Sequence, residues 1–210
     1  GNAAATVTSA SFTVDRTAPT AFTVGSVITT GGTVVANYWN VTNTGIDIIV
    51  PLDNDASLTG GTLQIRANVA GVGFVNLGSA HTILVGELNA DKTLSFNAAT
   101  FEGLTIANLE VTTFTAIITD KAGNVTTGTQ STTTITFDET ASLITNVTAT
   151  TADGSYKQGD QINITVTFNE DVIVNVGGGR PSLTLVNTGG TNPKADYTTG
   201  TGTNTLTFNY

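Results

Sequence analysis

Alternation of apolar and polar residues with a period of two is the feature of this sequence that most restricts its fold. In the segment QINITVTF, Ile162, Ile164, Val166 and Phe168 are apolar, and the residues between them are Asn or Thr. Successive side chains of a β-strand point to opposite faces, so this segment predicts a strand with one buried face. The same alternation predicts further strands within residues 46–52, 63–69, 114–118 and 172–176.

The composition favours an all-β fold. Threonine makes up roughly a fifth of the chain, and this β-branched residue suits a pleated surface. The 23 glycines and the many Asn and Asp residues are turn formers. Many short strands separated by such turns are typical of a β-sandwich. Residues 99–109 (ATFEGLTIANL) are ambiguous and fit one helical turn that crosses between sheets.

The charge balance excludes several classes of partner. The net charge is −9, and the 7 Lys and Arg residues are scattered singly, whereas a nucleic-acid interface needs clustered basic residues. No apolar run approaches the roughly 20 residues that span a bilayer, so we expect no membrane insertion in this segment. The chain has no cysteine, so neither disulfides nor thiolate metal sites are available.

An internal repeat indicates how the domains are organised. The first residues, GNAAATVTSASFTVDRTA, align with GNVTTGTQSTTTITFDETA further along the chain, with a slip of one residue. Asp15 then matches Asp138, which gives a spacing of about 123 residues. We therefore predict the last strand of a preceding domain at residues 1–15, a complete β-sandwich at 16–138 and a second β-sandwich at 139–210.

Several motifs resemble bacterial immunoglobulin-like repeats of very large cell-surface adhesins, such as the extender repeats of RTX-type adhesins. They are the junction VDRTAPT, the hairpin ITDKAGN, and the stretches SYKQGDQINITVTFNEDVIV and RPSLTLVNTGGTNPKADYTTGTGTNTLTFNY. The resemblance implies tandem immunoglobulin-like Greek-key β-sandwiches arranged end to end, secreted without disulfides and stiffened by calcium. Similar repeats continue past a motif like TLTFNY into a further AGN hairpin, so we expect the domain at 139–210 to be incomplete at its C-terminal end.

In that topology the entry linker and two turns lie at the same pole of a domain. Here these segments bring four carboxylates together. Such carboxylates repel one another, and Ca²⁺, which takes about 6 to 8 oxygen ligands, relieves the repulsion. The predicted calcium ligands at this first junction are Asp15, Asp53, Asp55 and Asp120, with Asn54 and Asn124 as auxiliary ligands.

A thinner set of acidic residues marks the second junction. Asp138 and Glu139 lie in the linker, and Glu170 and Asp171 are expected in a turn between QINITVTF and VIVNV. We predict calcium there as well. For both junctions the alternative is that each Asp only forms an Asx turn or caps a loop.

Catalysis has little support in the sequence. The only histidine, His81, has no partners at the spacing that a nucleophile and its general base require. Asp53 and Asp55 are on one short loop and do not by their spacing flank a glycosidic bond. We therefore expect no enzymatic activity.

The predicted function is that of a structural spacer or fibre repeat in an extracellular bacterial surface or adhesion protein. One alternative is a glycan-binding module in which Tyr38 or Trp39 stacks on a sugar, although Trp39 is more typical of a core residue. Another is an extracellular filament in which residues 3–14 of one copy complete the domain at 141–210 of the next.

Overall fold

A computed structural model of the chain describes residues 13–186, 190 and 192–210. The chain divides into two compact units, Gly1–Thr140 (unit 1) and Ala141–Tyr210 (unit 2). The sequence places this boundary at 138/139. Most of the strand predicted at residues 1–15 lies outside the described residues, and Thr13, Val14 and Asp15, which are described, belong to no strand.

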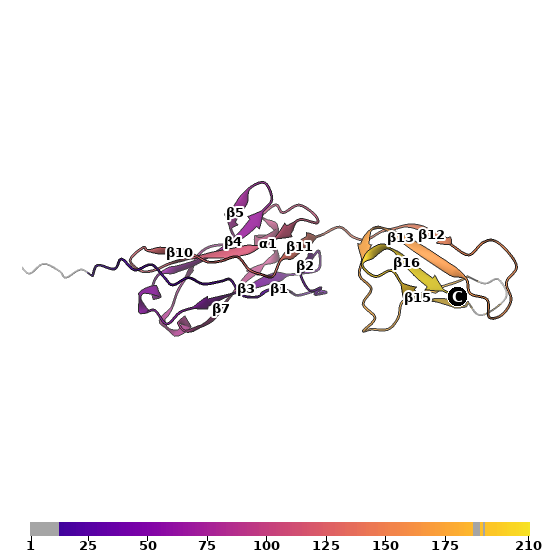
Figure 1. Ribbon diagram of the computed structural model, residues 1–210, viewed down its shortest axis with the longest axis horizontal. Helices are drawn as coiled ribbons and strands as arrows, with labels where there is room; N and C mark the ends of the chain where they lie inside the picture. The colour runs from indigo at the N-terminus through magenta and orange to yellow at the C-terminus, as the bar shows by residue number, and fades with distance from the viewer. Residues whose placement is uncertain (1–12, 187–189, 191) are drawn as a thin grey trace, which may run out of the picture. The chain divides into compact units, whose positions relative to one another are not determined.

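Unit 1 is built from two larger sheets and one small sheet (Figure 1). The first sheet has the order β1-β3-β7 and the second has the order β10-β9-β4-β5, with β6 also paired to β4. Consecutive strands β3 and β4 therefore belong to different sheets, and the later strands β7 and β9 return to pair beside them. The strands of these sheets are β1 (Val27–Thr30), β3 (Gly45–Leu52), β4 (Thr62–Val69), β5 (Gly73–Asn76), β6 (His81–Thr82), β7 (Ala90–Asn97), β9 (Phe114–Thr119) and β10 (Val125–Thr127).

The small sheet and the short helices complete unit 1. Strand β11 pairs in parallel with β2 and antiparallel with β8. These strands are β2 (Tyr38–Asn40), β8 (Val111–Thr112) and β11 (Ile135–Asp138). The helical segments are η1 (Ala56–Leu58), η2 (Val85–Glu87) and α1 (Ala98–Glu102). Helix α1 begins one residue before the segment 99–109 and ends within it. The helical turn considered for this segment is therefore present at its start.

The two larger sheets of unit 1 enclose one apolar core. Ile46, Ile48 and Val50 of β3 are fully buried, as are Leu63 of β4 and Phe114 of β9, and all belong to one cluster of packed side chains. Alternation explains this arrangement, because each strand directs every second side chain between the sheets. The unit is nearly all β, and its layers are consistent with a β-sandwich.

Trp39 connects the small sheet to this core. Its side chain is 0% exposed, and its ring meets that of Phe101 in α1 edge to face, with ring centroids 4.8 Å apart. Phe101 also contacts the rings of Phe114 and Phe137. Aromatic side chains bury large areas and favour such tilted contacts, so helix α1 and β2 are held against the sheets by this cluster.

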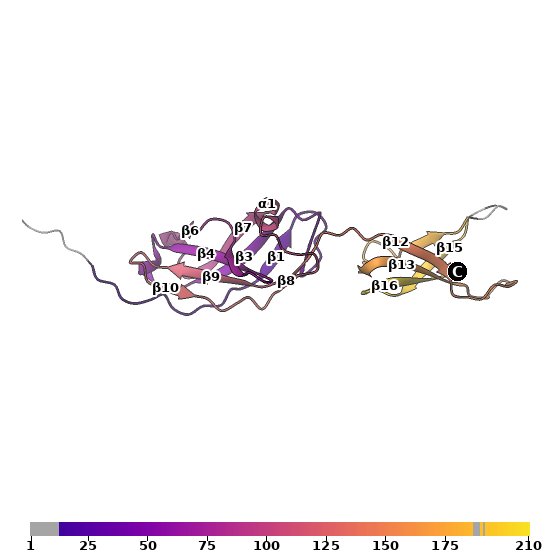
Figure 2. The same cartoon turned by 90° about the horizontal axis from the view of Figure 1, so that it is seen from above.

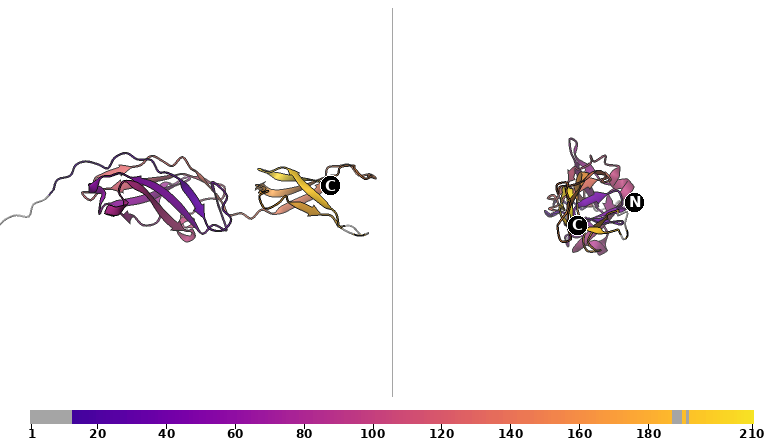
Figure 3. Two further views of the ribbon diagram at one scale, coloured as in Figure 1. Left: turned by 90° about the horizontal axis from the view of Figure 1, so that it is seen from below. Right: turned by 90° about the vertical axis from the view of Figure 1, so that its right-hand side faces the viewer.

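Unit 2 is one antiparallel sheet with the order β12-β13-β16-β15-β14. Two further directions of view show the ribbon of this unit (Figures 2 and 3). Val166, Tyr197, Leu206 and Phe208 form the buried centre of its apolar side. The opposite side of β13 and β16 carries Thr and Asn residues. The strands are β12 (Ile144–Ala149), β13 (Asn163–Val172), β14 (Ser182–Thr184), β15 (Lys194–Thr199) and β16 (Thr203–Asn209).

The apolar side of unit 2 is only partly covered. Val147 pairs with Val166 and Ile144 pairs with Phe168, so these four side chains share one face. Ile144 and Val147 are 60% and 56% exposed. We call the surface formed by Ile144, Val147, Ile164 and Phe168 the open face.

Most of the strands predicted from alternation are confirmed, and one is wrong. Strands β3, β4, β9 and β13 coincide with predicted segments. The separate strand predicted at residues 172–176 is absent. Strand β13 continues through Asp171 and ends at Val172, and residues 173–176 form no strand. Its register against β16 shifts between Thr167 and Val172, so the irregularity expected there is a change of register within one strand instead of a turn.

Candidate functional site

Asp120, the most buried of the predicted calcium ligands, is a turn residue. Asp120 directly follows β9 and is 3% exposed. Oδ1 accepts hydrogen bonds from the backbone N–H groups of Ala122 and Asn124, each at 2.8 Å, and Oδ2 accepts one from Nδ2 of Asn124 at 2.8 Å. The hydrogen bond from the Asn124 side chain, with the backbone donors, lowers the pKa of Asp120 although burial opposes this.

Asn124 joins this turn to the segment that enters unit 1. Besides Asp120, its Nδ2 reaches the backbone carbonyl oxygen of Asp15 at 3.4 Å. The Asp15 carboxylate accepts a hydrogen bond from the Thr17 N–H at 3.0 Å, which is a local turn contact. The entry segment and the 120–124 hairpin are therefore neighbours, as the sequence predicts for this pole.

Asp53 and Asp55 are held in different ways. Oδ2 of Asp53 accepts a hydrogen bond from the Thr20 hydroxyl at 2.9 Å, and Oδ1 accepts one from the Asn54 N–H at 2.7 Å. Asp55 is the N-cap of η1, where its Oδ1 accepts from the N–H of Ser57 at 2.8 Å. Asp53 thus ties β3 to the entry segment, and Asp55 stabilises its own loop.

The predicted ligands do not converge on a single point. Within the described parts of the chain, no three or more His, Cys, Asp or Glu side chains are grouped so that they could hold a metal ion. Three donors occupy the oxygens of Asp120, which makes it a poor ligand without rearrangement. Asp15 and Asp53 are more accessible, and they fit a calcium site better than Asp120 or the capping residue Asp55.

At the second junction, the predicted ligands are divided between the units. Asp138 ends β11 and accepts a hydrogen bond from the Thr140 N–H at 3.2 Å. Glu139 accepts one from the buried indole N–H of Trp39 at 3.3 Å. Glu170 and Asp171 belong to β13 of unit 2. The predicted set therefore contains one pair in each unit.

Glu102 is a neighbour of Glu139 that the sequence did not indicate. Burial raises the pKa of Glu102, and the adjacent Glu139 carboxylate raises it further. Helix α1 places Glu102 directly after Phe101, whose ring contacts Trp39. The aromatic cluster thus brings two carboxyl groups together at the end of unit 1, and no spacing rule would have paired residues so far apart in the chain.

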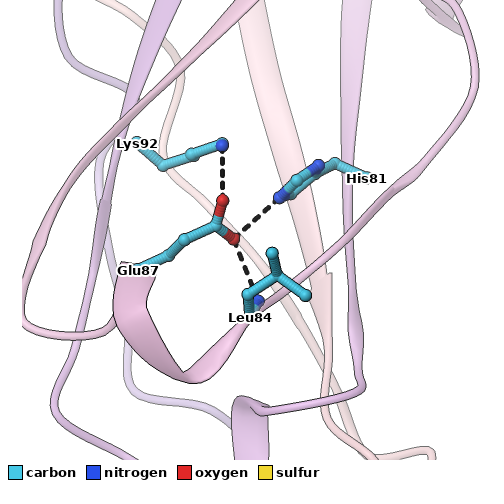
Figure 4. A network of polar contacts seen from close by, with 4 residues as sticks. All are labelled: His81, Leu84, Glu87 and Lys92. Carbon is cyan, nitrogen blue, oxygen red and sulfur yellow. Dashed lines mark hydrogen bonds and ion pairs between the residues drawn. The ribbon is translucent and has the colours of Figure 1, made fainter.

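His81 belongs to a small polar network centred on Glu87 (Figure 4). Nε2 of His81 lies 2.8 Å from Oε2 of Glu87, Lys92 contacts Oε1, and the N–H of Leu84 donates to Oε2 at 2.9 Å. Burial alone would raise the pKa of Glu87, but the hydrogen bonds from Lys92, His81 and Leu84 lower the pKa to about 2. The network fixes η2 between β6 and β7. The Glu87 carboxylate is hydrogen-bonded to Nε2 of His81.

Comparison with known proteins identifies no family for the chain. Its sequence matches no protein-family model and no curated protein. Among the described residues, no helix is long and apolar enough to cross a membrane.

Proposed function

We propose that the chain is a structural repeat segment of a large extracellular bacterial surface or adhesion protein, with immunoglobulin-like sandwiches as its units. The observation that carries the proposal is the strand order of unit 1. The orders β1-β3-β7 and β10-β9-β4-β5 correspond to the A-B-E and G-F-C-C′ strands of an immunoglobulin-like Greek key. A second β unit follows in the same chain, and there too the first strand, β12, pairs with the next, β13, which also pairs with a later strand, β16, as in the order β1-β3-β7. This supports a tandem array of similar units, which we propose acts as a spacer.

Calcium at the domain junctions is a further part of the proposal. At the first junction, the accessible carboxylates of Asp15 and Asp53 are the residues that would supply oxygens, while Asp120 organises the turn beside them. A bound Ca²⁺ would supply positive charge that offsets the repulsion between these carboxylates. At the second junction, Asp138 and Glu139 belong to unit 1 and Glu170 and Asp171 belong to unit 2, so calcium there stays a prediction from the sequence.

Small-angle scattering of the full chain tests the spacer and calcium proposals separately. An elongated particle is expected in chelator and in about 2 mM calcium, a concentration above the affinity range of extracellular modules. Calcium should further lengthen the particle and raise the melting temperature of the native chain. It should do neither in the double variant Asp15→Asn, Asp53→Asn. The matched control, Asp153→Asn in unit 2, should respond to calcium as the native chain does. A compact particle in both buffers contradicts the spacer, and an elongated particle without any calcium response contradicts only the calcium site.

A strand-complemented filament is a second candidate function. The observation that favours it is the open face, where Ile144 and Val147 are exposed although they share a face with buried core residues. Strands from another copy that cover this face would remove it from water. The segment proposed to supply the covering strand, residues 3–14, lies almost entirely outside the described residues. Sedimentation of the full chain should then show association that rises with concentration and is lost in Val147→Lys, and a monomer at all concentrations would exclude the filament.

The glycan-binding alternative loses its predicted platform. Trp39 is 0% exposed and its indole N–H is bonded to Glu139, so its ring offers no surface to a sugar. Tyr38, the other proposed residue, is half-buried in β2. A saccharide site on this chain would need a different surface.

A further inference from the structure

A hollow in unit 1 is lined by segments that are far apart in the sequence. It has a volume of about 580 Å³ and lies between the segment before β1, the end of β3, the start of β7 and strand β9. Its apolar lining includes the half-buried ring of Phe22 and the buried side chains of Leu52 and Ile118. This volume falls in the range of small-molecule sites, which combine an apolar surface with a few polar groups.

Polar groups line the same hollow. Asp53 is held in place by the hydrogen bond from Thr20, which also lines the hollow. The N–H of Asn89 donates to the Asp53 carbonyl at 3.3 Å, and Asn89 adopts a left-handed backbone conformation with φ 57°. The side chains of Asn89 and Asp91 are exposed and make no hydrogen bond or ion pair with any described residue. A carboxylate and a carboxamide are therefore free to bind a ligand beside an apolar surface.

The charge of the hollow restricts the ligand. Both ion pairs among the described residues involve Glu87, so no Lys or Arg in that part of the chain pairs with Asp53 or Asp91. An anionic ligand would be repelled by two carboxylates. A ligand with several hydroxyl groups would instead donate hydrogen bonds to the carboxylates and accept them from the Asn89 carboxamide.

We propose that this hollow binds a neutral saccharide. A hexose ring has hydroxyl groups on its edge and an apolar C–H surface on its face, which matches the polar groups of Asp53, Asn89 and Asp91 beside the Phe22 ring. Uronic acids and sialic acids are excluded by charge. The site goes beyond the spacer role because it gives a repeat unit its own contact with glycans, and it shares Asp53 with the proposed calcium site of the first junction.

Saturation-transfer NMR and calorimetry on the full chain in excess chelator test the proposal. The probes are the methyl glycosides of mannose, glucose and galactose, with glucuronic acid as the anionic counterpart. We expect at least one neutral glycoside to bind and glucuronic acid to give no signal. Asp91→Ala should weaken binding by about tenfold, because it removes charge-assisted hydrogen bonds. Asn89→Gly, which tolerates the left-handed backbone, should weaken it by several-fold.

The control variant is Asp196→Ala, which removes an exposed carboxylate from unit 2 and should leave binding unchanged. Melting curves of all variants check that unit 1 remains folded. The proposal is overturned if none of the neutral glycosides binds, if binding persists in the Asp91→Ala and Asn89→Gly double variant, or if binding requires calcium. None of these results bears on the particle shape that tests the spacer function, so the two proposals can fail separately.

Discussion

The two units pair their first strands in the same order but bury them to very different extents. In unit 1, Val27 of β1 pairs with Ile48 of β3, and Val27 is 5% exposed. In unit 2, Val147 of β12 pairs with Val166 of β13, and Val147 is 56% exposed. The neighbouring strand is apolar in both cases, so the difference arises from the second sheet, which covers β1 and β3 in unit 1.

This comparison separates two contributions to the stability of a β unit. Strand pairing satisfies the backbone hydrogen bonds in both units, but burial of an apolar side chain requires a second layer. Complete burial of a Val or Leu side chain contributes about 1.5 to 3 kcal/mol. We therefore expect unit 1 to be the more stable unit, with a separate unfolding transition at higher temperature than unit 2.

The largest expected effect is the loss of the aromatic cluster in unit 1. Trp39→Ala removes a fully buried ring that contacts Phe101 and leaves a cavity, so the free energy of unfolding of unit 1 should fall by about 3 to 5 kcal/mol. Tyr197→Ala is the matched change in unit 2, and it should affect only the lower transition. Denaturant unfolding followed by circular dichroism measures both variants, since Trp39 is the only tryptophan of the chain and its removal leaves no indole fluorescence. A shift of both transitions by Trp39→Ala would show that the units do not unfold independently.

A matched pair of substitutions tests the covering layer directly. Val27→Thr places a hydroxyl group in the core and should destabilise unit 1 by about 1 to 3 kcal/mol. Val147→Thr places the same group on the open face, where water reaches it, and should change the stability of unit 2 by less than about 0.5 kcal/mol. The measurement is the unfolding midpoint of each unit. Equal losses for the two variants would mean that the open face is covered in solution.

Alternation predicted the faces of the strands but not their partners. The segments of β3, β4, β9 and β13 were identified because period-two patterning depends only on local sequence. The parallel pairing of β2 with β11 joins residues about 100 positions apart, and neither strand shows a sequence pattern that specifies it. The turn expected at Glu170 and Asp171 was wrong because β13 continues through both residues, and a shift in its register against β16 between Thr167 and Val172 accommodates them within one strand.

The same limit applies to the candidate site. The sequence correctly grouped Asp15 with the 120–124 hairpin, since the internal repeat and the fold class together place them at one pole. It missed the Glu87 network, whose members come from β6, η2 and β7 and show no motif. It also missed the role of Asn89 and Asp91, because a hollow formed by four segments exists only after folding.

The Glu87 network predicts an acid-sensitive contribution in unit 1. The folded-state pKa of Glu87 is about 2, below its ordinary value of 4.5, so its stabilisation is present above about pH 4.5 and is lost as the pH falls towards 2. After allowance for solvent screening, we expect about 1 to 2 kcal/mol. Unfolding of the native chain and of Glu87→Gln between pH 2 and 6 measures it. The difference between the two proteins should vanish at the acid end, and a constant difference would refute the linkage.

The smallest expected effect concerns the loop between β3 and β4. Asp55→Ala removes the side-chain cap of η1 and should destabilise unit 1 by about 1 kcal/mol, because the N–H of Ser57 loses its acceptor. Asp153→Ala, which removes an exposed carboxylate in unit 2, is the control and should have no measurable effect. Melting in chelator and in calcium separates the two interpretations of Asp55. If Asp55 is a capping residue, the loss of stability is the same in both buffers. A loss that appears only with calcium would identify Asp55 as a metal ligand. The loops of unit 1 would then depend on an ion as well as on their own hydrogen bonds.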